Sequence, residues 1–157
     1  MRIDERDERD ALALHDRLLA LHGGASAVRD LGLLQSALAR PQQQLADAES
    51  PSPLDMAAAY TAGIAKNHPF VDGNKRTGFV IAVLLVELNG YRFHASEESA
   101  AQAVLGLAGG LLDDAGYGPF FGTMLRGVGN RYHVRLLPNE SDTRDRLTAI
   151  HFVVRYR

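Results

Sequence analysis

HPFVDGNKRT (residues 68–77) separates two hydrophobic segments of this 157-residue chain and determines how each of them is interpreted. The segment before it, Leu54 to Lys66, is rich in alanine and is predicted to be a helix. That helix should end near His68, because a residue that precedes proline avoids helical dihedral angles. The segment after it, Arg76 to Leu88, carries apolar residues on nearly all sides, which predicts a buried central helix. Asn89-Gly90 is a typical end for such a helix.

Further helices are expected on both sides of this central pair. They span residues 10–21, 30–39, 96–112 and 116–125. The second is expected to end at Arg40-Pro41, and Ser96 is expected to cap the third. The polar stretch from Pro41 to Pro53 is predicted to be a loop or a mobile flap.

The tail of the chain has a different character. Residues 132–137 and 149–156 alternate polar and apolar side chains, which predicts a small β-hairpin. The chain is therefore expected to consist of a helical domain, residues 1–127, and a C-terminal extension of unknown role, residues 128–157. The predicted fold class is all-α (mainly helical), with the small hairpin as its C-terminal addition.

The composition excludes several classes of protein. A net charge of −2 argues against a nucleic-acid-binding domain, which is usually strongly basic. The absence of cysteine excludes disulfides and thiolate metal sites, and it suits a reducing cytoplasm. The longest apolar run, Gly78 to Val86, is too short for a bilayer, which needs about 20 residues. We therefore expect a cytoplasmic protein that has neither nucleic acid nor membrane as its partner.

The start of the central helix has the features of an anion site. The first N–H groups of a helix lack internal partners, and Gly73 permits close approach of the backbone to a ligand. Lys75 and Arg76 oppose the helix macrodipole there, each by roughly 0.3–1 kcal/mol, unless an anion is bound. A polyphosphate would satisfy both side chains. The alternative is a pair of solvated surface charges.

Three further side chains in the stretch suit phosphate chemistry. A neutral imidazole such as His68 can accept a proton from a hydroxyl near neutral pH. Asp72 is a natural Mg²⁺ ligand beside phosphates, and Asn74 can hold the loop or bind a phosphate. Taken singly, each also has a structural interpretation: a helix-terminal histidine, an aspartate that stabilises a turn and an asparagine tolerant of unusual dihedral angles.

Taken together, these residues resemble the active-site motif of the Fic/Doc family, H-P-F-x-D/E-G-N-x-R, at every fixed position. The similarity extends from about residue 10 to residue 125 and favours the Doc-type branch. It is carried outside the motif by HGG (22–24), RDLGLLQSALARP (29–41), AKN (65–67) and ELNGY (87–91). The resemblance implies the all-α Fido fold.

The resemblance also implies roles for individual residues. His68 would be the general base toward a hydroxyl of a target protein, and Asp72 would hold Mg²⁺ on the nucleotide. The phosphates of ATP would be bound by Gly73, Asn74, Lys75 and Arg76. ATP and Mg²⁺ are thus the implied cofactors. The other histidines, among them His15, are expected to be structural or surface residues.

Two positions favour phosphoryl transfer over AMP transfer. Many AMP-transferring Fic enzymes have glycine where this chain has Lys75, and a second arginine where it has Phe79. Lys-Arg-Thr is the form of Doc-type toxins, which resemble kinases that phosphorylate a threonine of elongation factor Tu. The implied function is a Doc-type toxin that transfers a phosphoryl group from ATP to that target and inhibits translation. An AMP or other nucleotidyl transferase on the same fold, and a catalytically silent binding protein, stay open as alternatives.

The resemblance also bears on how the activity would be inhibited. Fic proteins are often inhibited by a helix with the pattern S/T-x-x-x-E-G/N, and these 157 residues contain no serine or threonine followed four positions later by glutamate. Restraint is therefore expected in trans, from an antitoxin with a disordered tail. By the same resemblance, Pro41 to Pro53 would be a flap that holds the target near His68.

Overall fold

The two hydrophobic segments beside residues 68–77 form the central helices α3 (Pro53–Asn67) and α4 (Asn74–Leu88) in a computed structural model of the chain. Ser52 caps α3, because its Oγ accepts a hydrogen bond of 3.2 Å from the backbone N–H of Leu54. Both predicted helices are confirmed, although α4 begins at Asn74 rather than Arg76.

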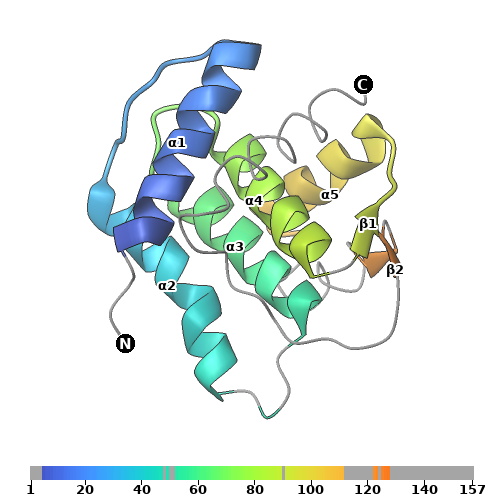
Figure 1. Cartoon of the computed structure of the whole chain (residues 1–157). Helices are drawn as coiled ribbons and strands as arrows, with labels where there is room; N and C mark the ends of the chain where they lie inside the picture. Colours follow the sequence, from blue (N-terminus) through green and yellow to red (C-terminus); the bar gives the residue numbers. More distant parts are fainter. Residues whose placement is uncertain are drawn as a thin grey trace.

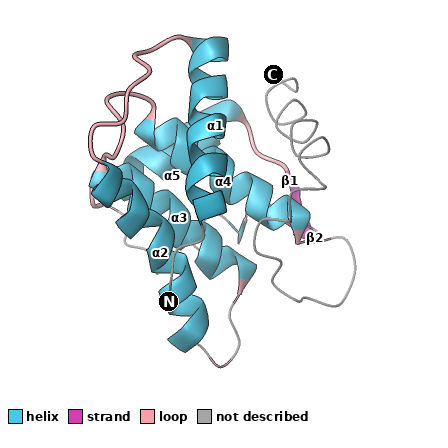
Figure 2. Ribbon diagram, turned by 60° about the vertical axis from the view of Figure 1, so that its left-hand side comes forward, coloured by secondary structure: helices cyan, strands magenta, loops and turns pink. Residues whose placement is uncertain are grey.

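The structure describes residues 5–47, 49, 52–89, 91–111, 122–123 and 125–127. The remaining elements are α1 (Glu5–His22), α2 (Leu31–Asp47), β1 (Tyr91–Phe93), α5 (Glu97–Ala108) and β2 (Leu125–Gly127). The strands form a short antiparallel pair in which Tyr91 lies opposite Gly127. This pair lies beside the end of α4 from which β1 leaves (Figure 2). The chain is mainly helical, so the predicted fold class is confirmed.

α4 is the buried central helix, as its composition predicted. Ala82, Val83 and Val86 are fully buried along it. α3 packs between α4 and α2, and α1 lies across α2 and α4 (Figure 1). Among the largest fully buried side chains are Leu18, Leu34, Leu38, Met56, Ile64, Phe70, Leu85 and Leu107. None of the described helices is both long and apolar enough to cross a membrane.

The predicted end of the second helix at Arg40-Pro41 is wrong, because α2 continues through Pro41 to Asp47. A proline inside a helix costs about 3 kcal/mol and leaves the carbonyl four residues earlier, here that of Ala37, without its usual partner. Packing offsets this cost. Gly63 of α3 allows such a close approach that a Cβ atom there would lie 2.9 Å from the Ala37 carbonyl oxygen. Pro41 and Gln42 are themselves buried.

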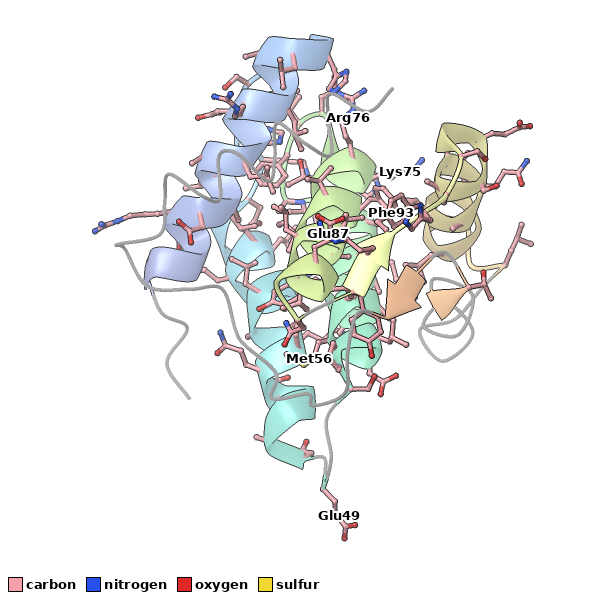
Figure 3. All side chains as sticks on the ribbon, turned by 45° about the vertical axis from the view of Figure 1, so that its right-hand side comes forward. Glu49, Met56, Lys75, Arg76, Glu87 and Phe93 are labelled. Atoms are coloured by element: carbon pink, nitrogen blue, oxygen red, sulfur yellow. The ribbon has the colours of Figure 1, made fainter. Side chains whose placement is uncertain are left out.

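The flap expected over Pro41 to Pro53 is also wrong for residues 41–47, whereas residues 48, 50 and 51 lie outside the described part. Residues 41–47 belong to α2, and the connection that follows joins the N-terminal end of α3, whereas His68 lies at its C-terminal end. A helix of 15 residues is about 22 Å long. Accordingly, Glu49 and Arg76 lie at opposite ends of the molecule (Figure 3). Composition alone had indicated a loop, and it could not show which end of α3 that loop approaches.

The predictions for the second half of the chain have mixed outcomes. The cap at Ser96 is confirmed by its Oγ, which accepts a hydrogen bond of 3.1 Å from the Ser99 N–H. α5 ends at Ala108 instead of residue 112, because Gly109 and Gly110 follow, the latter with a positive φ of 77°. Of the helix predicted at 116–125, Leu125 lies in β2, and residues 112–121 lie outside the described part. So does the predicted hairpin.

Candidate active site

The loop between α3 and α4 begins with a strained residue. His68 is the C-cap of α3 and adopts the left-handed conformation, with φ 51° and ψ 54°. Its N–H donates to the carbonyl of Ile64 at 3.2 Å. For a residue with a side chain this conformation costs roughly 1–2 kcal/mol. Among the described residues, His68 alone combines a positive φ with a side chain, and such strain persists only where surrounding contacts hold it.

Asn74 closes the loop through a reciprocal pair of hydrogen bonds. The N–H of Phe70 donates to Asn74 Oδ1, and Asn74 Nδ2 donates to the Phe70 carbonyl, both at 2.8 Å. Both residues are buried. The pair fixes the orientation of the amide, and Nδ2 then lies 3.4 Å from Nδ1 of the exposed His68 ring. Of the two roles considered for Asn74, these contacts describe the loop-holding one.

A buried histidine of α1 supports the loop from below. The ring of His15 stacks on that of Phe70 with a centroid distance of 3.7 Å. Its Nδ1 lies 3.2 Å from Oγ1 of the buried Thr77, in the first turn of α4. Burial lowers the pKa of His15 below its usual value, although the nearby carboxylates of Asp16 and Asp72 act in the opposite direction. His15 is thus a structural residue, as expected.

The segment before α2 supports the loop from its outer side. Val28 and Phe70 form an isolated antiparallel bridge, and the N–H of Val71 donates to the Ala27 carbonyl at 3.0 Å. Arg29 follows directly and hydrogen-bonds the backbone around His68. Sequence reasoning missed this support, because a bridge between segments so far apart leaves no local pattern. The only signal was the similarity of RDLGLLQSALARP to the Doc-type branch.

The start of α4 carries the predicted cations. Gly73 is its N-cap, with a positive φ of 76° that glycine adopts without strain, and no side chain caps this end of the described helix. Lys75 and Arg76 are exposed on the first turn, where there is no acidic residue (Figure 3). Asp72 is exposed just before it, and its Oδ1 accepts a hydrogen bond of 2.6 Å from the Gly73 N–H. The predicted site residues therefore lie together between the end of α3 and the first turn of α4.

Comparison with known proteins identifies the family. The model of the Fic/DOC family matches residues 5–86. The chain belongs to the Fic/DOC family. It is 43% identical over 74 residues to a protein named Toxin Doc from Mycolicibacterium smegmatis, which covers 46% of this chain and 57% of that protein. It is 32% identical over 91 residues to the Protein kinase doc of Escherichia phage P1, covering 58% of this chain and 72% of that protein. The resemblance to the Doc-type branch is thereby confirmed.

The metal expected in a Fic/DOC site can be tested against the donor set. The described residues contain no group of three or more histidine, aspartate or glutamate side chains that could hold an ion alone. Mg²⁺, however, usually takes only one or two carboxylates and completes its shell with phosphate oxygens and water. The exposed carboxylate of Asp72, two residues before the start of α4, fits such a shared site.

Phe79 separates this Fic/DOC chain from the AMP-transferring pattern. Its ring is partly buried and meets Phe93 of β1 edge to face, with centroids 5.5 Å apart and planes at 77°. The position that carries a second arginine in that pattern is therefore occupied by a ring that packs against β1. No phosphate-binding group is present at that position.

Proposed function

We propose that this chain is a Doc-type toxin that transfers a phosphoryl group from ATP to a threonine hydroxyl of elongation factor Tu and so inhibits translation. The proposal rests on the position of the predicted base and the predicted phosphate-binding cations on the two sides of one short loop. A histidine held at the end of α3 and two cations at the start of α4 lie within one loop whose backbone is fixed by Asn74. Phosphoryl transfer asks little more of a protein than positioning and charge stabilisation.

His68 is proposed as the general base. In its neutral form it accepts the proton of the attacking hydroxyl while the new oxygen–phosphorus bond forms and the bond to ADP breaks. The backbone N–H groups of the first turn of α4, directly after Gly73, and the side chains of Lys75 and Arg76 bind the phosphates, whereas the Gly73 N–H itself donates to Asp72 Oδ1. Mg²⁺, held by Asp72 together with phosphate oxygens, would neutralise further negative charge on the nucleotide. Asn74 acts through the loop, since both ends of its amide are bound to Phe70.

The packing of Phe79 supports phosphoryl transfer over AMP transfer. AMP transfer requires the α-phosphate to be presented to the nucleophile, and the second arginine that serves this purpose in other family members is replaced here by a packed aromatic ring. Lys75 adds bulk and charge where those enzymes have glycine. The printed name of the phage relative, Protein kinase doc, points in the same direction.

The proposal is tested by following each phosphate of ATP separately. The purified chain is incubated with elongation factor Tu, Mg²⁺ and ATP labelled at either the γ or the α phosphate. We expect label on a threonine of the target from the γ position and none from the α position. Label from the α position would support AMP transfer instead. No label from either would favour a silent binding protein.

The proposed toxin also needs restraint. We infer that an antitoxin acts in trans, because these 157 residues lack the serine- or threonine-based inhibitory pattern of self-restrained Fic proteins. A disordered antitoxin segment that folds on binding suits this role. Both partners are expected in the cytoplasm, where ATP and elongation factor Tu are found.

A further inference from the structure

Arg29 contacts the backbone of three consecutive residues around the proposed base. Its Nε donates to the His68 carbonyl at 2.6 Å, and its Nη2 donates to the Asn67 carbonyl at 2.8 Å. Its own N–H donates to the Pro69 carbonyl at 2.7 Å. A single residue of the segment before α2 therefore hydrogen-bonds the three carbonyls that follow one another at the C-terminal end of α3.

These hydrogen bonds are made to carbonyls at a helix end, where intrahelical partners are missing. The last carbonyls of a helix have no intrahelical partner, and Asn67 ends α3. His68 follows in a left-handed conformation that residues with side chains avoid. Charge-assisted hydrogen bonds from a guanidinium are stronger than neutral ones, and its planar fork can serve two adjacent acceptors at once. A lysine offers a single point charge and cannot reproduce that geometry.

We propose that Arg29 is a positioning residue: its guanidinium holds the left-handed turn at His68 and thereby fixes where the imidazole meets the acceptor hydroxyl. Because Nε and Nη2 of Arg29 are directed at backbone carbonyls, we assign its guanidinium to the turn and not to phosphate. The inference rests on the proposed function of His68. It predicts an effect on the chemical step and not on nucleotide affinity.

Two variants of the full chain remove the fork. Arg29→Lys keeps the charge, and Arg29→Met keeps most of the apolar stem. In both, the N–H of residue 29 can still bind the Pro69 carbonyl. Arg92→Lys makes the same substitution on exposed β1, at the opposite end of α4, and serves as the matched control.

We expect kcat of phosphoryl transfer to fall about 10- to 100-fold in Arg29→Lys and Arg29→Met, because a base displaced by about 1 Å loses that much. KM for ATP should stay within about twofold of the wild-type value, because a lower kcat at constant KM is the sign of an interaction lost in the transition state and not in substrate binding. Arg92→Lys should match wild type in both. An unchanged kcat, or a higher KM for ATP at constant kcat, would overturn the inference.

Nuclear magnetic resonance of ¹⁵N,¹³C-labelled protein gives a second readout that needs no substrate. The Cα and N–H resonances of His68, which report its positive φ, should move in both Arg29 variants, while those of Thr77 in α4 stay in place. His68 resonances that match wild type would contradict the positioning role. This measurement shows whether Arg29 holds the turn at His68, even if the wild-type chain fails to modify the proposed target. Failure of the proposed function and failure of this inference are therefore distinguishable.

Discussion

His15 lies 62 positions before Thr77 in the chain, yet its ring joins α1 to the loop and to the first turn of α4. Its Nε2 is buried and has no hydrogen-bond partner among the described residues. Protonation of the ring would therefore place a charge where little compensates it, and burial accordingly lowers the pKa of His15. The carboxylates of Asp16 and Asp72 reduce this effect without reversing its direction.

This residue predicts the pH dependence of stability. Because the folded pKa is below the unfolded value of about 6.5, the unfolded state binds more protons, and stability is lost as pH falls below about 6.5. The contribution of one such group is at most about 1.4 kcal/mol per pH unit. His15→Phe keeps an aromatic ring against Phe70 but cannot titrate. Urea unfolding between pH 7.5 and about pH 5 should give a shallower loss of the free energy of unfolding in this variant, and equal slopes would contradict the prediction.

At the scale of single elements, α4 begins with charges that weaken the helix itself. Lys75 and Arg76 each oppose the macrodipole by roughly 0.3–1 kcal/mol. If they bind phosphates, replacing either by alanine should raise the Kd for ATP roughly ten- to hundredfold, which corresponds to the about 1.5–3 kcal/mol of a charged hydrogen bond. The same substitution should leave thermal stability unchanged or slightly higher.

Isothermal titration calorimetry with ATP and Mg²⁺ and a thermal melt of each variant test both halves of this prediction. Arg92→Ala, which removes an exposed cation from β1, should leave the affinity for ATP unchanged. Variants of Lys75 or Arg76 that bind ATP as tightly as wild type would support two solvated surface charges instead.

The contact between α2 and α3 predicts that a glycine-to-alanine change at this contact lowers stability, whereas helix propensity alone predicts that it raises stability. Alanine is better than glycine inside a helix by about 1 kcal/mol. At Gly63, however, the added Cβ would meet the Ala37 backbone, 2.9 Å from its oxygen and 3.1 Å from its Cα. We expect Gly63→Ala to lower the free energy of unfolding by about 1–3 kcal/mol, the usual range for overpacking.

Gly32→Ala is the matched control for this change. It lies in the exposed first turn of α2, where the nearest atom to an added Cβ is a side-chain oxygen of Asp30, 3.2 Å away. Chemical denaturation should show no loss of stability there. If Gly63→Ala were as stable as Gly32→Ala, the close approach of α2 and α3 would not explain why the helix tolerates Pro41.

Across the whole molecule, the sequence pattern predicted the features that depend on residues close together in the chain. The alanine-rich and apolar helices and the cap at Ser96 could be predicted from sequence, because they depend on neighbours a few positions away. The roles assigned to the residues of the turn stay predictions. The continuation of α2 through Pro41 could not, since it depends on packing against Gly63 of another helix. The supports from His15 and Arg29 were missed for the same reason. The assignment of residues 128–157 as a separate extension stays a prediction.

The intact mass of elongation factor Tu shows whether His68 is the base for the transfer of one phosphate to this target. After incubation with the chain, ATP and Mg²⁺, the target should gain the mass of one phosphate. The gain should persist with His94→Ala, a control at an exposed histidine outside the site, and vanish with His68→Ala. A gain of one AMP would contradict phosphoryl transfer, and a phosphate still added by His68→Ala would contradict the role of His68 as the base.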